Sequence, residues 1–363
     1  MDTILSSDAT ILPSSGHSPN LVLFKRSARG WSQAELAKRA EISRAAVSAI
    51  ESARLTPSVT AALSLARVLE CSVEELFGRP TGVAKAGPAW AWQPWQEPCR
   101  YWEAEIFGRR LLYPAEALAL NPLPHDGLWR KGICHDARDA AENTLTVATC
   151  DPAAGLLARE YQRESGFRML VFPRGGSPSL GLARQRLIHV AALHRSTLEN
   201  PDRNAVTARA ELGGNSRLLR AARWESGVAL AATDRTRSVS NLSRRVRQWA
   251  AREPGSAARE CLEALLGGKT PDGRVVDGHS GVGEAVRAGW AEAGVCVKVS
   301  AMEARLNFLP LQIESLDFCF HSSLENDPRI QALIRVLRGR RYRQALAELP
   351  GYDAKLTGEL SSV

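Results

Sequence analysis

A loop past the middle of the chain carries the residues best suited to binding an anion. It reads AREPGSAAR over residues 251–259 and lies between a strand-like segment, VRQWAA, and a helix-like segment, ARECLEALL. Free backbone amides at a helix start can donate hydrogen bonds to an anion, and flanking arginines can add charge-assisted ones. The sequence therefore predicts a small-anion site lined by Arg252, Gly255, Ser256, Ala257 and Arg259. A plain turn and helix cap is the alternative role for the Gly-Ser pair.

Two further loops carry polar residues at the same kind of position. Cys150 and Asp151 follow the apolar segment TLTVAT, and His279 and Ser280 lie in the segment GHSG, where another helix is expected to start. In an open α/β sheet such loops converge on one crevice, so we expect these residues to face the same ligand. Because a carboxylate repels an anion, capping of its own helix is the alternative role for Asp151. Packing or capping is the alternative for His279.

Strand and helix patterns alternate from residue 143 onward. The segments TLTVAT, RMLVFP, LIHVAAL and VRQWAA read as strands, and PAAGLLAREYQRE, SPSLGLARQR and GSAARECLEALL read as helices. This alternation predicts an α/β domain over residues 143–363, with a mainly parallel sheet covered by helices on both faces. We expect His194 and Arg195 to pack at the end of their strand, with a place in the same crevice as the alternative. We expect the arginines of residues 335–343 to lie on a solvated helix face, with a contact to DNA as the alternative.

Two short helices joined by a tight turn are predicted near the N-terminus. Ser32 and Glu35 have the spacing of a capping box, in which the hydroxyl accepts from the amide of residue 35 and the carboxylate reaches back to the amide of residue 32. The helix ends at the turn Glu41–Ile42, and Ser43 is placed to cap the next helix, RAAVSAIES. This is a helix-turn-helix unit, in an all-α domain that we place at residues 20–78.

The same stretch resembles the Cro-like, or XRE, helix-turn-helix family. Its motifs are S-Q-x-E-L-A, I-S-R-x-x-V-S-x-I-E, P-S and L-A-x-x-L, in that order, and Glu41 stands where the family commonly has a turn glycine. The resemblance implies a homodimer that places the second helix of each pair in the major groove of double-stranded DNA. The residues implied to contact DNA are Gln33 and Arg54 at phosphates and Ser43, Arg44, Ala45 and Ser48 at the reading end of the helix.

Segments within residues 143–358 resemble a periplasmic-binding-protein-like domain that is fused to helix-turn-helix modules and related to molybdate-binding proteins. The segments are LTVATCDPAAGLLA, RLIHVAALH, AREPGSAARECLEALL, GHSGVGEAVRAGWAEAG and LNFLPLQIESLDF. The resemblance implies a two-lobed fold that binds a small oxyanion such as molybdate or tungstate, with no other cofactor.

Composition favours a cytoplasmic protein with an anionic partner. The 47 lysines and arginines exceed the 39 aspartates and glutamates, which gives a formal net charge of +8. Residues 1–19 read as a flexible tail without signal-peptide features, and no apolar stretch is long enough to suggest a membrane partner. The seven scattered cysteines favour reduced thiols, so we expect no metal site. Residues 79–142 read as a linker rich in proline and tryptophan, with a β-hairpin over 101–113.

Together these patterns predict a DNA-binding transcriptional regulator controlled by a small anion, not an enzyme. One alternative is a ligand-free repressor whose C-terminal domain binds a protein partner. Another is an enzyme that uses the C-terminal cleft, with Asp151, His194 and His279 as its titratable groups. No nucleophile and base at a recognisable spacing support the enzyme.

Overall fold

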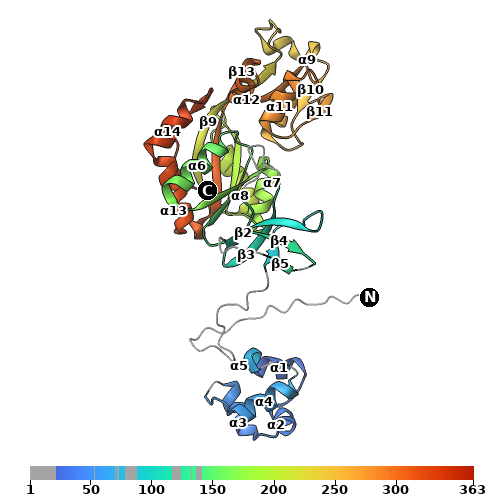
Figure 1. The fold of residues 1–363 in the computed structure, drawn as a ribbon, viewed down its shortest axis with the longest axis vertical. Coiled ribbons are helices and arrows are strands. Elements are labelled where there is room, and N and C mark those ends of the chain that lie inside the picture. Colours follow the sequence, from blue (N-terminus) through green and yellow to red (C-terminus); the bar gives the residue numbers. More distant parts are fainter. Residues whose placement is uncertain are drawn as a thin grey trace, which may run out of the picture. The chain divides into compact units, whose positions relative to one another are not determined.

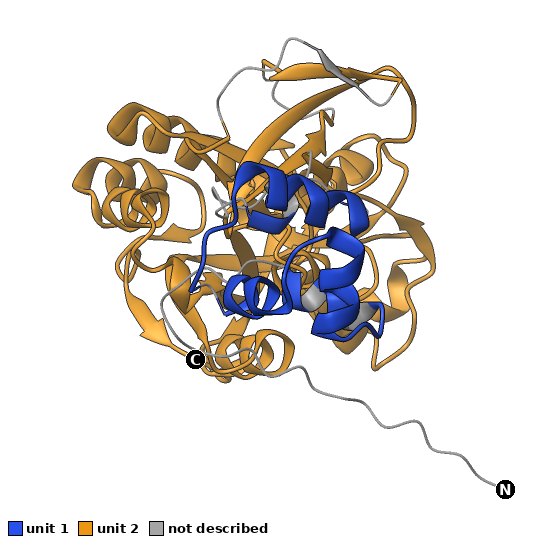
Figure 2. Ribbon diagram, turned by 90° about the horizontal axis from the view of Figure 1, so that it is seen from below, with its two compact units in different colours: residues 1–86 blue, residues 87–363 orange. Residues whose placement is uncertain are grey.

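The chain forms two compact units, residues 1–86 and residues 87–363, which Figure 2 shows in different colours. The structure, a computed structural model, describes residues 22–52, 54–69, 71, 73–77, 88–116, 124–131, 133–135 and 141–363. The tail predicted over residues 1–19 lies outside the described residues. No helix in the described ranges has the length and apolar character needed to cross a membrane.

The described part of the first unit is helical, as predicted. Its helices are α1 (Val22–Ala28), α2 (Gln33–Ala40), α3 (Arg44–Glu51), α4 (Val59–Val68) and α5 (Val73–Phe77). One apolar cluster holds them together, and Leu36, Val47, Ile50 and Leu65 in it are at most 1% exposed. The apolar stripes of α2 and α3 thus form the core of a small helical domain.

Serine caps fix where α2 and α3 begin. The Ser32 hydroxyl accepts a hydrogen bond from the amide of Glu35 at 3.1 Å, and the Ser43 hydroxyl accepts one from the amide of Ala46 at 3.0 Å. These are the two caps predicted from the sequence. The Glu35 carboxylate, predicted to reach back to residue 32, accepts a hydrogen bond from Arg39 Nε at 2.8 Å.

The turn between α2 and α3 holds a non-glycine residue in the left-handed region. Glu41 has φ 55° and ψ 38°, and its amide donates to the carbonyl of Ala37. A side chain in this conformation costs roughly 1–2 kcal/mol relative to glycine. The turn is therefore strained at the position where the resemblance favours glycine, while the helix pair around it keeps its geometry.

A five-stranded sheet opens the second unit. Its strand order is β1 (Ala89–Trp90), β3 (Arg109–Pro114), β2 (Cys99–Ile106), β4 (Gly127–Arg130) and β5 (Ile133–His135). The predicted hairpin is β2–β3. Trp102 and Ile106 on this sheet share one buried cluster with Leu170 and Phe172 of the main sheet. The structure thus differs from the linker predicted over residues 79–142, because successive residues of β2 and β3 are buried on both faces of a packed sheet. Residues 79–87 of the predicted linker lie outside the described residues.

The main sheet has ten strands, and two of them are much longer than the rest. Its order is β11 (Gly273–Val275), β10 (Trp249–Ala251), β12 (Ala293–Val297), β9 (Ser216–Leu230), β13 (Asn307–His321), β8 (Val190–Thr197), β6 (Thr144–Thr149) and β7 (Arg168–Pro173), with β14 (Tyr352–Asp353) and β15 (Leu360–Ser362) also paired to β9. β6 is parallel to β7 and β8, and β10 is parallel to β11 and β12. β9 and β13 are antiparallel to their neighbours. The predicted mainly parallel sheet is therefore mixed, and the antiparallel pair was not foreseen.

β9 and β13 divide the second unit into two lobes, both visible in Figure 1. The first lobe contains β6–β8 with α6 (Ala154–Ser165), α7 (Gly176–Arg184), α8 (Arg203–Leu212), α13 (Pro328–Arg338), α14 (Arg340–Ala347) and the turn η2 (Ser322–Leu324). The second lobe contains β10–β12 with η1 (Val239–Asn241), α9 (Leu242–Arg245), α10 (Ala257–Leu265), α11 (Gly278–Arg287) and α12 (Lys298–Glu303). At Gly227 of β9, a Cβ atom would stand 2.2 Å from the carbonyl oxygen of Leu309 in β13. The close approach of these two paired strands therefore requires glycine at this position.

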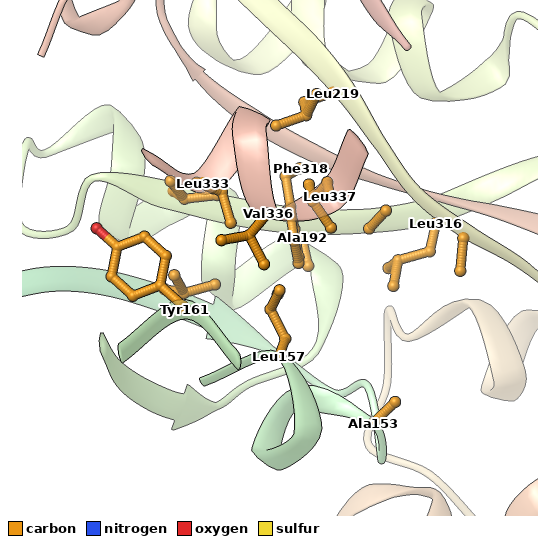
Figure 3. Close-up of a cluster of buried hydrophobic side chains, with 14 of the residues drawn as sticks. Ala153, Leu157, Tyr161, Ala192, Leu219, Leu316, Phe318, Leu333, Val336 and Leu337 are labelled. Atoms are coloured by element: carbon orange, nitrogen blue, oxygen red, sulfur yellow. The ribbon is translucent and has the colours of Figure 1, made fainter. Parts of the chain in front are cut away.

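The largest apolar cluster lies in the first lobe (Figure 3). Leu157 and Tyr161 of α6 and Leu333 of α13 pack with Ala192 and Phe318 of the sheet. This cluster fixes the strand ends of β6 and β8, from which two side chains of the site described below extend.

The arginines of α13 and α14 do more than cover a solvated face. Arg338 Nε donates to the carbonyl of Gly358 at 2.9 Å, and Arg343 donates to the carbonyls of Ala354 and Lys355. These bonds hold the C-terminal segment against the two helices. Arg338 and Arg343 therefore have a structural role, which the prediction of a solvated helix face did not include.

Candidate functional site

The N-terminal end of α3 presents the residues predicted to read DNA. Ser43 caps the helix, and Ser43, Arg44 and Ala45 are exposed, while Ser48 is half-buried. Val47, one turn further along the helix, is fully buried. The core contacts therefore orient α3 so that its first turn faces outward, which is the orientation that a recognition helix needs.

The two residues predicted to contact phosphates, Gln33 and Arg54, differ in how free their side chains are to bind an anion. Gln33 Nε2 donates to Glu51 at 2.8 Å, and Glu51 is also bonded to Arg26, so Gln33 helps to join α2 to α3. Arg54 is exposed, and its Nε donates to the Ser52 hydroxyl at 2.9 Å. The guanidinium of Arg54 is thus open to an anion, whereas Gln33 would have to leave Glu51 to reach one.

The second candidate site lies between the two lobes and brings together residues that are far apart in the sequence. Cys150 directly follows β6, and His194 lies near the end of β8, both in the first lobe. Arg252 directly follows β10, and His279 is the second residue of α11, both in the second lobe. We call these four residues the inter-lobe cluster. Three of its members follow the carboxyl end of a parallel strand or start a helix, as expected at the crevice of an α/β sheet. His194 lies within β8.

His194 is the centre of this cluster. Its Nε2 lies 3.2 Å from the Cys150 sulfur, and its Nδ1 lies 2.7 Å from the Glu314 carboxylate. Trp224 Nε1 and Gln312 Nε2 donate to the same carboxylate at 3.0 and 2.8 Å. His279 Nε2 lies 3.9 Å from the Cys150 sulfur. A thiol, an imidazole and a carboxylate therefore stand in line, which is the order of a nucleophile, a base and an orienting group.

Electrostatic interactions favour the ionised forms of Cys150 and His194. Burial raises the pKa of the Cys150 thiol, but the neighbouring His194 and Arg252 outweigh it and lower that pKa below its ordinary value. Burial lowers the pKa of His194, but Cys150 and Glu314 outweigh it and raise that pKa. Burial, together with the charges of Arg252 and His194, keeps the pKa of His279 well below its ordinary value. The pKa shifts of Cys150 and His194 therefore favour transfer of a proton from the thiol toward the imidazole, and the shift of His279 favours its neutral form.

The predicted anion loop is folded back on itself. Ser256 caps α10 by accepting from the amide of Arg259, and it donates to the carbonyl of Glu253 at 2.9 Å. Arg259 Nε pairs with Glu263 at 2.7 Å. Arg252 Nε and Nη2 pair with Glu253, but its Nη1 is buried and has no hydrogen-bond partner. Of the three predicted donor side chains, Arg252 alone keeps an unpaired buried nitrogen.

Contacts across the cleft hold the lobes together beside this loop. Arg195 Nη1 pairs with Glu260 at 2.6 Å, and Arg195 Nη2 donates to the carbonyl of Gly255 at 2.8 Å. Arg203 also pairs with Glu260, at 3.0 Å. Arg195, expected to pack, thus links the first lobe to α10 and its loop. Ala257, the first residue of α10, is half-buried at the same boundary.

The other predicted ligand residues lie in different surroundings. The Asp151 carboxylate accepts hydrogen bonds from the amide of Ala153 and from the Tyr352 hydroxyl. It does not cap α6 as the alternative supposed, because the N-cap of that helix is Ala153, without a side-chain cap bond. Ser280 is exposed, unlike its buried neighbour His279. The structure therefore brings Cys150, Arg252 and His279 together and leaves Ser280 on the surface.

Glu314 and Trp224 were missed by the sequence reasoning, and His194 was assigned to packing. All three are at most 2% exposed and lie on long or central strands of the sheet. The available signal was the pair of carboxylates, Glu314 and Asp317, in the otherwise largely apolar segment LPLQIESLDF, because a buried carboxylate needs partners.

Comparisons with known proteins agree with this division of the chain. A family model described as "Helix-turn-helix" matches residues 24–76, and one described as "PBP superfamily domain" matches residues 158–338. The helix-turn-helix match falls in the first unit and the PBP superfamily match in the second. These matches confirm both predicted domain types and the fold class, an all-α domain followed by a periplasmic-binding-protein-like α/β domain.

The individual relatives are distant. The uncharacterized protein YvgK of Bacillus subtilis (strain 168) is 32% identical over 116 residues, which span 30% of this chain and 37% of that relative. Among solved structures, PhnD1 from Prochlorococcus marinus (MIT 9301) in complex with methylphosphonate is similar with a TM-score of 0.43 and 13% identity, covering 61% of this chain and 93% of that one. An ABC-type phosphate transport receptor from Vibrio cholerae has a TM-score of 0.42 and 15% identity, covering 58% and 99%.

Proposed function

We propose that this protein is a cytoplasmic, DNA-binding transcriptional regulator whose two-lobed domain binds a small effector between its lobes. The observation that carries the proposal is α3, because its capped first turn exposes Arg44 and Ala45 while Val47 holds the helix to the core. A helix held in this way can enter the major groove and read base edges. In this proposal the protein acts by binding and not by catalysis.

We propose that it binds DNA as a homodimer. One short recognition helix contacts too few base pairs for useful specificity in a genome, and two heads on adjacent half-sites solve this problem. We expect nuclease footprinting to show two protected half-sites whose centres are one helical turn, roughly 34–36 Å, or a multiple of it, apart. Protection of a single asymmetric half-site by a monomer would contradict the homodimer.

The effector that we propose is a small oxyanion such as molybdate or tungstate, bound next to Arg252. Two features support an anion there. Arg252 Nη1 is buried without a partner. The Glu253 carboxylate, which Arg252 holds, lies against Gly175 at the start of α7, where a Cβ atom would stand 2.3 Å from Glu253 Oε1. An oxyanion that displaced this carboxylate would gain both the guanidinium and the free amides of a helix start.

Effector binding is expected to change the affinity for the operator. Coupling between two sites is on the order of 1–3 kcal/mol, so one of molybdate, tungstate, sulfate or a small carboxylate should shift operator affinity about fivefold to 150-fold. Linkage requires the operator to shift anion affinity by the same factor. Calorimetric titration of the full chain with each anion, with and without an operator selected from random DNA, measures both effects.

The matched pair for this experiment is Arg252→Gln and Arg247→Gln. Arg247 is an exposed arginine just before β10, so its loss removes a charge from the same lobe without touching the cleft. We expect Arg252→Gln to lose the anion response and keep anion-free operator affinity, and Arg247→Gln to keep both. Unchanged anion binding in Arg252→Gln would place the effector elsewhere, and no binding of any tested anion would make the oxyanion proposal wrong.

A further inference from the structure

Three side chains of the inter-lobe cluster aim their metal-binding atoms at one another. The Cys150 sulfur and one ring nitrogen each of His194 and His279 all lie within 4.8 Å of one another. His194 is 2% exposed and His279 is 1% exposed. Cys150 and His194 come from the first lobe and His279 from the second. A thiolate with two imidazoles is a donor set that soft and borderline transition metals prefer.

The separations between these atoms fit a single shared ion. With a metal–sulfur bond of about 2.3 Å and metal–nitrogen bonds of about 2.0–2.1 Å, a sulfur and a nitrogen on one tetrahedral zinc ion stand about 3.6 Å apart. The Cys150 sulfur lies 3.2 Å from His194 Nε2 and 3.9 Å from His279 Nε2, one distance on either side of that value. Both sulfur–nitrogen distances therefore lie within a few tenths of an ångström of the value for a shared ion.

The groups behind His194 hold it in the form that binds metal. Its Nδ1 lies 2.7 Å from Glu314, which leaves Nε2 directed toward Cys150. Metal-binding histidines commonly donate their second ring nitrogen to a carboxylate, which fixes the tautomer and the ring orientation. Glu314 is itself fixed by Trp224 and Gln312. His279 differs, because its Nδ1 is buried without a hydrogen-bond partner.

The charges around the cluster are compatible with a cation. Glu314 contributes a buried carboxylate directly behind His194, and Cys150 contributes a thiolate when a metal replaces the proton. The guanidinium of Arg252 is the opposing charge, and Glu253 compensates it through two hydrogen bonds of 2.8 and 2.9 Å. A metal ion would therefore replace the thiol proton in surroundings that already contain the negative charge of Glu314.

We propose that Cys150, His194 and His279 bind one soft or borderline metal ion, of the class of Zn²⁺ or Cu⁺, and so join the two lobes. Three protein ligands leave a fourth position open for water or another small ligand. This metal site goes beyond the proposed function. The anion of the proposed function contacts Arg252 and the start of α7, whereas the metal contacts Cys150, His194 and His279. The three metal ligands are different residues from the groups proposed to hold the anion, although Arg252 lies beside Cys150.

The experiment uses the full-length protein, treated with a chelator and a reductant and then titrated with Co²⁺. We expect one Co²⁺ per chain, with intense tetrahedral d–d absorption and a thiolate-to-cobalt charge-transfer band, both removed by stoichiometric Zn²⁺. A titration with Cu⁺ under anaerobic conditions should likewise saturate at one ion per chain. Cys150→Ser should lose the charge-transfer band, and Glu314→Gln should bind Co²⁺ about 10–100-fold more weakly while keeping the band.

Cys99→Ser is the matched control, because Cys99 is a partly buried thiol in the five-stranded sheet. It should bind Co²⁺ as the unmodified protein does. Since Cys150→Ser could also perturb folding, a second measurement uses the unmodified protein. Zn²⁺ should slow alkylation of Cys150 by iodoacetamide at least tenfold and leave the alkylation of Cys99 unchanged, as read by peptide mass spectrometry.

Three results would overturn the metal site. They are the absence of a charge-transfer band in the unmodified protein, a band that survives in Cys150→Ser, and equal alkylation of Cys150 with and without Zn²⁺. Rapid alkylation that Zn²⁺ does not slow would instead identify Cys150 as a reactive nucleophile. Operator binding and the anion titration are to be measured on protein treated with a chelator. The outcome of the metal experiments therefore leaves the test of the proposed function unchanged.

Discussion

Replacing Val47 with aspartate is expected to unfold the helix-turn-helix domain and abolish operator binding. Val47 is fully buried in the middle of α3. The change removes roughly 1.5–3 kcal/mol of apolar burial and buries a carboxyl group without a partner, at a cost of roughly 2–7 kcal/mol. A domain of this size is stable by on the order of 3–8 kcal/mol, so the sum is enough to unfold it. Binding to the selected operator, followed by fluorescence anisotropy, should fall to the background level.

The matched control is Val59→Asp. Val59 is the first residue of α4 and is 78% exposed, and a carboxylate in the first turn of a helix is favourable. We expect this variant to bind DNA normally. Calorimetry should show that Val47→Asp loses the unfolding transition of the first unit and keeps that of the second, because the two units have separate cores. Normal operator binding by Val47→Asp would mean that α3 is not held as described.

Arg44→Ala is expected to remove most of the discrimination between the operator and random DNA. Arg44 is exposed at the first position of α3, where a bidentate contact to guanine is predicted. Loss of such a contact costs roughly 1–3 kcal/mol, which lowers the ratio of specific to non-specific affinity about fivefold to 150-fold. The ratio is measured by titrating the operator and a random duplex at one salt concentration, since both affinities depend on salt.

Arg54→Ala serves as the comparison for Arg44→Ala. Arg54 is exposed beyond the end of α3, where a phosphate contact is predicted. Its loss should weaken binding to both duplexes equally and reduce the salt dependence by about one counterion. If Arg44→Ala instead behaved like Arg54→Ala, with full sequence preference, then the first turn of α3 would not read bases.

The helix-turn-helix domain was predictable because its signals are local. Each cap joins residues three apart, as in Ser32 with Glu35 and Ser43 with Ala46, and the apolar stripes repeat within single helices. The strain at Glu41 could also be predicted from the sequence, because a non-glycine residue stands at a turn position where the family commonly has glycine. Gln33 shows where local signals stop being sufficient. Its hydrogen bond to Glu51 joins residues 18 positions apart and was not predicted.

The strands and helices around the cleft were also predictable, but their pairing was not. The apolar segments that become β6, β7 and β8 have the length and flanking turns of buried strands. β9 and β13, which carry the chain between the lobes, pair at long range and in antiparallel fashion. Their register depends on the packing of both lobes at once, and no local pattern encodes it.

The sequence by itself thus determined the two domain types, the capped helix α3 and most of the loops that meet at the cleft. Only the tertiary structure decided which side chains meet there. His194 is 44 residues from Cys150, and His279 is 129 residues from Cys150. Glu314, which orients His194, is a further 120 residues along the chain from it. The absence of closely spaced cysteines and histidines argued against a metal site, yet strand pairing and lobe contact place three such ligands within 4.8 Å. Spacing along the chain limits only local geometry, whereas a site between lobes depends on contacts between distant segments.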